Sequence, residues 1–451
     1  MTTDSVQKFL SAERAGERVR ERGGEYAVVR NPGYVFPSEE YCPLAPKIRG
    51  PVDRLVAVVQ DMDGTTTTTE TLCLHSLETM VRRITGRFSR SDWAGLDREC
   101  DYPHIIGNST TRHVEYLVET YAAEIREDCL RRALIMAAAW TLSKGADAGR
   151  REEVRATLRS LGWIDLLADD PEWQALLRPD VPAAELDAKA DGIAARHASL
   201  PLIGGFNDRV RAAIDIYYQR YHEILGELAR GRGKELARDL TGGRPLIEPM
   251  PGVAVFLALV RGWLGADAGV LYDELLASCR VPLDLPAPDE GRRRLAELGR
   301  RLASAPVRVA VVTSSIRYEA DIVLDEVRKI VREQVRGWPV QPAIAEGLER
   351  AQDLFDGIIT ATDSSEIRLK PHRDLYSIAL HALGVAPSDF GSVVGFEDSR
   401  SGTIAIRAAG VGLCVAVPFA DTAGHDLSAA AHVLRGGLPE AILKENLFLA
   451  G

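Results

Sequence analysis

The stretch that decides the fold is Leu55-Val56-Ala57-Val58-Val59-Gln60-Asp61-Met62-Asp63-Gly64-Thr65. Its apolar first half predicts a strand, which delivers two carboxylates, Asp61 and Asp63, two residues apart. Side chains at positions i and i+2 point the same way, so both carboxylates can face one reaction centre. One can attack phosphorus as a nucleophile, and the other can exchange a proton with the leaving or entering oxygen. Taken alone, the pattern is equally typical of an acidic turn after a strand.

Three later segments complete the pattern. The first is an apolar run that ends in hydroxyls, the second carries a lysine before a proline, and the third is an apolar run that ends in acids. They read Val307-Arg308-Val309-Ala310-Val311-Val312-Thr313-Ser314-Ser315, Leu369-Lys370-Pro371-His372-Arg373-Asp374-Leu375-Tyr376 and Val393-Val394-Gly395-Phe396-Glu397-Asp398-Ser399-Arg400-Ser401-Gly402. Each motif is weak by itself, whereas the motifs in this order are a strong signal for phosphoryl chemistry.

Strand patterns alternate with helical patterns over the second half of the chain. Helical periodicity is clearest at 317–336 and 374–383. Strands are expected near 55–60, 307–313, 357–361, 391–396 and 411–417. This alternation predicts the α/β class with a parallel, doubly wound sheet. The reactive groups of such sheets lie at the carboxyl ends of the strands, where these motifs fall.

With these motifs, the chain resembles the haloacid dehalogenase-like hydrolase superfamily, within it the phosphatases and phosphomutases related to β-phosphoglucomutase. The motifs that carry the resemblance are DMDGT, VVTSS, LKPHRDLY and GFEDSRSG. The resemblance covers about half of the chain, roughly 51–80, 245–265 and 305–445. It implies a Rossmann-like core with a large α-helical cap domain inserted after the first strand.

The domain organisation expected from this resemblance has three parts. They are an N-terminal extension at 1–50, a core domain at 51–70 and 246–451, and a helical cap at 71–245. Apolar positions in the last segment recur at three and four residues, which predicts helices. A further insertion is expected near 265–305. The proline- and tyrosine-rich second part of the N-terminal extension is either extended chain lying on the core or a disordered tail.

The resemblance also implies the role of each catalytic residue. Asp61 would attack in line and form an aspartyl-phosphate, and Asp63 would act as the general acid and then the general base. Lys370 would neutralise Asp61 and a phosphoryl oxygen, a task that suits a compact point charge. The Thr313 hydroxyl and the Ser314 backbone N–H would bind another phosphoryl oxygen. Together these groups would stabilise the charge of the transition state.

A metal cofactor is expected because a phosphate monoester repels a carboxylate nucleophile. Mg²⁺ prefers oxygen ligands in octahedral geometry and keeps several waters. The expected ligands are the Asp61 carboxylate, the Asp63 backbone carbonyl and Asp398. Glu397 is either an alternative ligand or a residue that supports the ligands, and the sequence does not rank these two roles.

Two features depart from the family or lie outside its motifs. The run Thr65–Thr69 has Thr68 where the common form has an aspartate, although Glu70 matches the acidic residue that closes the loop. Gly107-Asn108-Ser109-Thr110-Thr111-Arg112 resembles the family's substrate loop. Arg112 could therefore bind a second anionic group of the substrate, but a solvated helical arginine is the interpretation that the pattern favours.

Composition bounds the remaining possibilities. The chain of 451 residues is 46% hydrophobic and 27% charged, as in ordinary soluble globular proteins. Its net charge of −10 argues against a nucleic-acid partner. The sequence predicts neither a membrane span nor a signal peptide. Its six scattered cysteines are interpreted as reduced thiols of a cytoplasmic protein.

The expected function is that of a Mg²⁺-dependent phosphatase of a small phosphorylated metabolite. Asp63 argues against the dehalogenases and phosphonate hydrolases of the superfamily, which differ at that position. Two alternatives stay open: a phosphomutase of the sugar-phosphate type that uses the same aspartyl-phosphate, and a catalytically weak protein that binds a phosphorylated ligand. The sequence identifies neither the substrate nor the oligomeric state.

Overall fold

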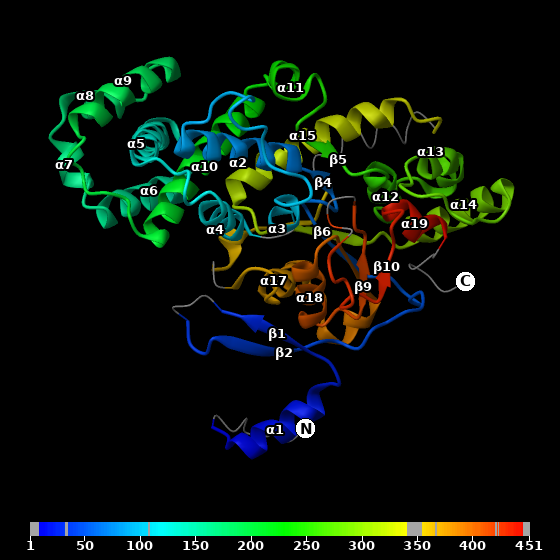
Figure 1. Ribbon diagram of the computed structural model, residues 1–451. Helices are drawn as coiled ribbons and strands as arrows, with labels where there is room; N and C mark the ends of the chain where they lie inside the picture. The colour runs from blue at the N-terminus through cyan, green and yellow to red at the C-terminus, as the bar shows by residue number, and fades with distance from the viewer. Residues whose placement is uncertain are drawn as a thin grey trace. The chain divides into compact units, whose positions relative to one another are not determined.

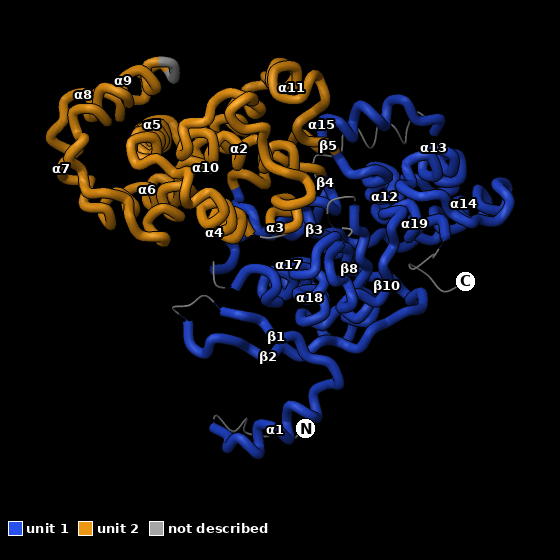
Figure 2. The backbone as a smooth tube through the Cα atoms, in the orientation of Figure 1, with its two compact units in different colours: residues 1–67, 249–317, 328–451 blue, residues 68–248, 318–327 orange. Residues whose placement is uncertain are grey.

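The computed structural model describes residues 9–31, 35–106, 109–340, 354–365, 368–419, 422 and 424–444. Its internal contacts divide the chain into two compact units, coloured blue and orange in Figure 2. Unit 1 consists of residues 1–67, 249–317 and 328–451, and unit 2 consists of residues 68–248 and 318–327.

Unit 1 contains a six-stranded sheet of order β10-β9-β8-β3-β6-β7, in which the described pairings are parallel (Figure 1). The strands are β3 Ala57–Asp61, β6 Arg308–Val312, β7 Gly357–Ile359, β8 Val393–Glu397, β9 Leu413–Ala416 and β10 His432–Val433. The predicted α/β class with a parallel sheet is confirmed. The sequence did not predict β10, because a two-residue strand has no apolar run to mark it.

Helices cover both faces of this sheet (Figure 1). On one face lie α17 Asp374–Ala382 and α18 Arg400–Ala408, which share a buried apolar cluster with the strands. On the other face lies α12 Val253–Val260, whose residues are all buried. Its Phe256 ring meets the Phe396 ring of β8 at 5.3 Å between centroids. Because β3 and β8 are buried on both faces, they read as nearly continuous apolar runs.

The strand register brings the ends of the motifs together. Asp61 pairs with Val312, the last residue of β6, so Thr313 follows directly beside it. Gln60 pairs with Phe396, and each of these residues is followed by an acid. The chain continues from β3 to β6 on one side and returns as β8 on the other. This change of direction is the position at which doubly wound sheets bind ligands.

The remaining elements of unit 1 surround this sheet. The region 265–305 forms a short helix and two further helices, η1 Gly265–Leu271, α13 Tyr272–Ala277 and α14 Pro288–Ser304. The other helices are α15 Arg317–Arg336, η2 Ala361–Asp363, η4 Pro387–Ser392 and α19 Leu438–Leu443. Helix α15 follows the Thr313 motif directly, and its residues 318–327 are counted with unit 2.

The described N-terminal segment packs on α18 through Ala27, Val29 and Leu44, which meet Ile404 and Ala408. It forms helix α1 Ala12–Arg22 and an antiparallel pair of strands, β1 Tyr26–Arg30 and β2 Glu39–Pro43. The buried Arg407 of α18 forms an ion pair with Glu25, and its Nε donates to the Ala45 carbonyl at 2.9 Å. Of the two alternatives that the sequence leaves open, the structure shows the chain lying on the core. Residues 1–8 and 32–34 lie outside the described residues.

Unit 2 is helical. Its helices are α2 Glu70–Thr85, α3 Tyr102–Ile105, α4 Thr110–Thr120, α5 Glu127–Lys144, α6 Ala148–Ser160, α7 Ile164–Ala168, α8 Pro171–Leu176, α9 Ala183–Arg196, α10 Phe206–Ala229 and α11 Gly233–Thr241. The longest, α10, packs against α2, α4 and α5. Helix α4 ends at Thr120, because the next residues form turns.

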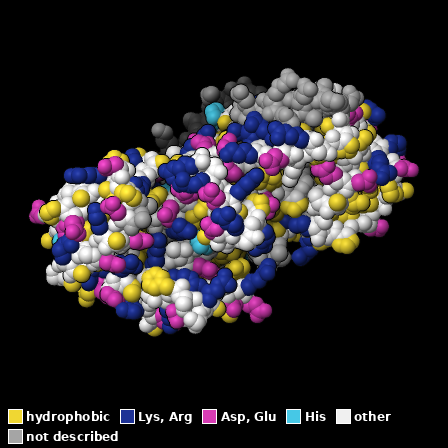
Figure 3. Space-filling view, turned by 90° about the horizontal axis from the view of Figure 1, so that it is seen from above, with side chains coloured by type: hydrophobic (Ala, Val, Ile, Leu, Met, Phe, Trp, Pro, Cys, Tyr) yellow, Lys and Arg dark blue, Asp and Glu magenta, His cyan; other side chains and the backbone are white. Residues whose placement is uncertain are grey.

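The two segments at which the chain passes between the units pair with each other as the short strands β4 Thr67–Thr68 and β5 Glu248–Pro249. Among the described residues, no helix combines the length and the apolar character needed to cross a membrane. On the face shown in Figure 3, basic and acidic side chains are interspersed rather than separated into fields of one sign.

Candidate active site

A buried lysine joins two carboxylates at the carboxyl ends of β3 and β8. The Lys370 ammonium contacts Asp61 Oδ1 and lies 2.8 Å from Glu397 Oε1. The side chains of Lys370, Asp61 and Glu397 are 7%, 7% and 1% exposed. An unpaired charge at such a depth costs several kcal/mol (roughly 3–5 when one partner is removed), so each of these groups depends on the others.

The same proximity shifts the pKa values of these groups. Burial, followed by repulsion from Glu397, raises the pKa of Asp61 well above its usual value, against the attraction of Lys370. Burial opposes the charge on Lys370, but attraction to Asp61 and Glu397 outweighs it and raises the pKa of the lysine. Lys370 therefore favours the ionised form of Asp61, and a further cation nearby would act in the same direction.

Glu397 accepts hydrogen bonds from several groups at the carboxyl end of β8. Its Oε1 accepts hydrogen bonds from Lys370 and from the Tyr376 hydroxyl, the latter at 3.3 Å. Its Oε2 accepts from the backbone N–H groups of Asp398 and Ser399, both at 2.9 Å, and from the Ser399 hydroxyl at 2.8 Å. These donors use the lone pairs that a carboxylate offers. Of the two roles left open by the sequence, this arrangement favours that of a supporting residue.

The space around Glu397 requires a glycine. A Cβ atom on Gly402 would lie 1.6 Å from Glu397 Oε1, a distance at which the carboxylate has to move. The GFEDSRSG motif therefore has a steric reason for the glycine that ends it: the first turn of α18 passes directly over the carboxylate. This requirement, rather than a turn geometry, explains the residue.

Asp63 and Thr313 form a second pair next to the first. The Thr313 hydroxyl donates to Asp63 Oδ2 at 3.1 Å and accepts from the Ser315 N–H at 3.0 Å. Asp63 is only half-buried, whereas Asp61 is buried, so the second carboxylate has the more open position of the two. Thr313 thus orients Asp63, and Ser314, which follows it, is exposed.

Asp398 approaches the loop that follows β3. Gly64 has a φ of +82°, and a Cβ there would lie 2.5 Å from Asp398 Oδ2 and 2.8 Å from the Phe419 ring. Glycine is therefore needed at position 64 both for its left-handed backbone and for the close approach of the carboxylate. This approach brings Asp398 toward the loop that carries Asp63.

The described residues contain one group of acids suited to a metal ion. One oxygen from each of Asp61, Glu397 and Asp398 lies within 4.8 Å of the other two, and all three residues are buried. Buried carboxylate oxygens without nitrogen or sulfur donors suit Mg²⁺ or another hard cation. The donor set therefore fits the expected magnesium, with Asp61 and Asp398 the carboxylates best able to bind it.

Arg280, which no sequence pattern marked, also reaches this region. It lies in the loop after α13, and its Nη2 donates to the Val417 carbonyl at 2.9 Å, just beyond the end of β9. Burial lowers the pKa of Arg280, while the negative charge of Asp398 raises it. The residue belongs to the region near 265–305, where an insertion was expected and the resemblance has no counterpart, so a resemblance could not reveal it.

Arg112 stands apart from these groups in sequence and in fold. It lies in α4 of unit 2, its side chain is 68% exposed, and it pairs with Glu115 at 3.1 Å. Gly107 and Asn108, which begin the predicted substrate loop, lie outside the described residues. The contact between Arg112 and the substrate stays a prediction.

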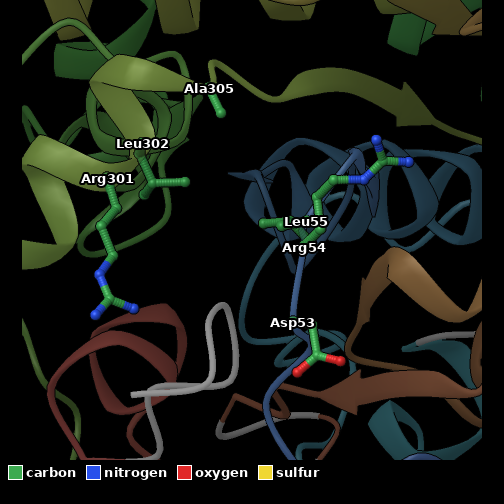
Figure 4. A pocket seen from close by; sticks show the side chains of 6 residues that line it. All are labelled: Asp53, Arg54, Leu55, Arg301, Leu302 and Ala305. Atoms are coloured by element: carbon green, nitrogen blue, oxygen red, sulfur yellow. The ribbon is translucent and has the colours of Figure 1, made fainter.

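A separate cavity of about 210 Å³ lies at the other end of β3 from Asp61 (Figure 4). It is lined by residues that precede this strand and by the end of α14: Asp53, Arg54, Leu55, Arg301, Leu302 and Ala305. Asp61 ends the strand and the cavity lies before its start, so the length of β3 separates this cavity from the site.

No family model and no curated protein sequence matches the chain. Several solved structures do. CbbY from Rhodobacter sphaeroides in complex with phosphate has 15% identity, covering 85% of this chain and 94% of that one, with a TM-score of 0.37. A putative β-phosphoglucomutase from Thermotoga maritima has 17% identity, covering 86% and 97%, with a TM-score of 0.34.

A third match is a HAD family hydrolase, a member of the haloacid dehalogenase-like superfamily, from Deinococcus radiodurans R1 with bound phosphate and sodium. It has 15% identity, covering 89% of this chain and 100% of that one, with a TM-score of 0.37. The structural neighbours are thus hydrolases and mutases of that superfamily at low identity. The geometry of this chain's own residues, rather than these similarities, defines the site.

Proposed function

We propose that this protein is a Mg²⁺-dependent phosphatase that hydrolyses a small phosphate monoester through an aspartyl-phosphate on Asp61. The observation that carries the proposal is the convergence of a buried Asp61–Lys370–Glu397 cluster with the more open Asp63–Thr313 pair. A nucleophile held by a cation beside a second carboxylate is the arrangement that phosphoryl transfer to an aspartate requires.

The first step forms a bond between Asp61 and phosphorus and breaks the bond from phosphorus to the ester oxygen. Because Lys370 holds Oδ1 of Asp61, the other oxygen, Oδ2, is the attacking atom. Asp63, protonated at this stage, gives its proton to the departing ester oxygen, so the alcohol leaves neutral. The hydrogen bond from Thr313 fixes the orientation of Asp63 during this transfer.

The second step returns the enzyme to its starting state. Asp63, now ionised, takes a proton from the water that attacks phosphorus, and the bond between phosphorus and Asp61 breaks to release inorganic phosphate. Lys370 neutralises the developing negative charge in both steps. Asp61, Asp398 and the Asp63 carbonyl would hold a divalent cation, which would supply the remaining positive charge that an anionic phosphoryl group needs.

Within the same proposal, unit 2 is the cap domain of the enzyme and selects the substrate. It is helical, and the chain enters and leaves it through the paired segments β4 and β5. Paired connections of this kind suit a domain that moves as a body to admit substrate and exclude water. The proposal therefore assigns the chemistry to unit 1 and part of the specificity to unit 2.

The experiment that tests the function is a phosphate-release assay. A panel of phosphorylated metabolites and p-nitrophenyl phosphate is incubated with the wild-type protein and with Asp61→Asn, in Mg²⁺ and in EDTA. Asp53→Asn is the matched control, because it makes the same change at an exposed residue that precedes the same strand. Release that needs Mg²⁺, persists in Asp53→Asn and is lost in Asp61→Asn is the expected result.

Three other results would change this assignment. Metal-dependent release that is undiminished in Asp61→Asn would remove the aspartyl-phosphate mechanism. Transfer of the phosphoryl group to a second sugar phosphate, in place of water, would identify a mutase. Absence of any release by a folded wild-type protein would leave the binding-protein alternative.

A further inference from the structure

Arg280 is held in place by segments that are distant in sequence. Its backbone N–H donates to the Gly436 carbonyl at 3.4 Å, and the neighbouring Cys279 thiol contacts the same carbonyl at 3.5 Å. At its far end, Nη2 donates to the Val417 carbonyl at 2.9 Å. Both ends of the side chain are thus fixed, which removes most of the freedom that an arginine has on a surface.

The turn between β10 and α19 leaves room for this arginine. Gly437 has a φ of +82°, and a Cβ there would lie 2.8 Å from Nη2 of Arg280. A Cβ on Gly436 would lie 2.6 Å from the Cys279 sulfur. Because these two consecutive glycines have no side chains, they leave the space in which the guanidinium lies. The packing of unit 1 therefore fixes the position of Arg280.

One end of the guanidinium has no partner. Arg280 Nη1 is buried from solvent and makes no hydrogen bond with any described residue. A buried donor without an acceptor costs free energy, and a donor on a charged group costs more. A ligand oxygen at this point would remove that cost, and a carboxylate or phosphate is the natural partner of a guanidinium.

The strand order places this donor away from the nucleophile. Val417 follows β9, which is separated from β3 by β8. Neighbouring strands lie about 4.8 Å apart, so the anchor of Arg280 is roughly 10 Å from the strand that carries Asp61. Lys370 already contacts Asp61, and Thr313 lies on the opposite side, next to β6. Arg280 is therefore placed beyond the reacting phosphoryl group, on the Asp398 side.

We propose that Arg280 binds an anionic group of the substrate other than the phosphoryl group that is transferred. The preferred substrates are then phosphate monoesters that carry a second carboxylate or phosphate. This inference rests on the proposed function, which it narrows to a substrate class. The competing view is that Arg280 only holds Asp398 in position, and the two views predict different binding behaviour.

Phosphonates test the proposal, because their carbon–phosphorus bond is stable and allows binding to be measured without turnover. Ethylphosphonate offers one anionic group, phosphonoacetate adds a carboxylate, and methylenediphosphonate adds a second phosphoryl group. Their affinities are measured by calorimetry at saturating Mg²⁺ for the full-length wild type, Arg280→Met and Arg280→Lys. Arg292→Met, which removes a half-exposed arginine of the same insertion, is the matched control.

The wild type and Arg292→Met are expected to bind at least one two-anion probe about tenfold or more tightly than ethylphosphonate. Arg280→Met should reduce this preference to about twofold or less, while the affinity for ethylphosphonate changes by less than about threefold. Arg280→Lys should retain part of the preference, since it keeps the charge on a shorter side chain. Whether phosphonoacetate or methylenediphosphonate shows the larger preference identifies the second anion as a carboxylate or a phosphate.

Other outcomes overturn the inference. If Arg280→Met and Arg280→Lys weaken Mg²⁺ binding and all probes equally, Arg280 only supports Asp398. If the wild type binds ethylphosphonate but shows no preference for either two-anion probe, this inference fails and the proposed function stands. If the wild type does not bind ethylphosphonate at all, the phosphoryl site itself is absent and the proposed function fails first.

Discussion

Both units bury charged side chains, but they do so in different ways. In unit 1, Asp61, Lys370 and Glu397 come from separate segments of the chain and meet at the carboxyl ends of parallel strands. In unit 2, Asp215 and His222 lie on one helix, α10, where Arg150 lies 4.0 Å from Asp215 Oδ1 and Glu319 lies 2.7 Å from His222 Nε2. The first arrangement converges on one point, whereas the second is spread along a helix–helix interface.

The contacts within unit 2 show what such an interface needs. His222 Nε2 lies 2.7 Å from Glu319 Oε1, with both side chains almost fully buried. The Arg150 guanidinium stacks 3.7 Å from the centre of the Tyr218 ring. These groups pair locally and stabilise the packing of α10. Burial of charge by itself therefore does not mark a reactive site, whereas the convergence of several carboxylates with a cation does.

The largest difference between the two units is expected when the cation of the Asp61–Lys370–Glu397 cluster is removed. Lys370→Met leaves Asp61 and Glu397 buried side by side, so turnover should fall about a thousandfold or more, which corresponds to about 4 kcal/mol. Stability should fall as well, by roughly 3–5 kcal/mol, because a buried charge loses its partner. The measurements are phosphate release and urea unfolding. Lys189→Met, which removes a partly exposed lysine paired with Glu185, is the control and should change neither quantity appreciably.

Substitution of glycine provides the next largest contrast between the units. Gly402→Ala places a methyl group against Glu397 and should cost about 1–3 kcal/mol of stability together with most of the activity. Gly226→Ala, in the last turn of α10, finds only an ordinary contact at 3.6 Å and should stabilise the protein by about 0.4–1 kcal/mol. Thermal unfolding and phosphate release measure both variants. A Gly402→Ala protein that is as stable and active as wild type would contradict the supporting role of Glu397.

Several strands of this fold could be predicted from the sequence, and the reason is physical. A parallel sheet covered on both faces has strands that are apolar on both sides, so β3, β6 and β8 are continuous apolar runs. Reactive groups follow those runs directly. Asp61 and Glu397 could therefore be named, because chain order alone places them at the ends of strands.

Other parts could not be predicted, because they depend on contacts between distant segments. The role of Glu397 depends on which donors surround it, and Tyr376 is not adjacent to it in sequence. Arg280 gains its place only through the carbonyl of Val417 and the space above Gly437. Likewise, the docking of the N-terminal segment depends on Arg407, which reads in the sequence as an ordinary helical arginine.

The pH dependence of unit 2 gives a smaller effect. Burial raises the pKa of Asp215 to about 7, although the Thr157 hydrogen bond and Arg150 act in the opposite direction. The unfolded chain loses the proton of Asp215 near pH 3.8, the ordinary pKa of this carboxyl, whereas the folded protein keeps it to about pH 7. Between these values, this residue should lower the free energy of unfolding by about 1.4 kcal/mol for each unit of rising pH, and above pH 7 its contribution should be constant.

Asp215→Asn tests this expectation, because asparagine has no proton to lose. Its advantage in stability over wild type should grow between about pH 5 and pH 7 in urea unfolding experiments. Asp187→Asn, at an exposed position of α9, is the control and should run parallel to wild type at every pH. An Asp215→Asn protein that also runs parallel to wild type would show that Asp215 is ionised in the folded state, despite its burial.

The smallest effect is expected at Arg112 of unit 2, whose exposed side chain contrasts with the buried Lys370 of unit 1. An exposed pair such as Arg112–Glu115 contributes about 0.3–0.5 kcal/mol, because water screens it and its long side chains lose freedom when they pair. Arg112→Met should therefore leave stability within about 0.5 kcal/mol of wild type and kcat/KM within about threefold. A rise in KM of tenfold or more with unchanged kcat would instead place Arg112 on the substrate, and would mean that an exposed cation of unit 2 shares the recognition proposed for Arg280.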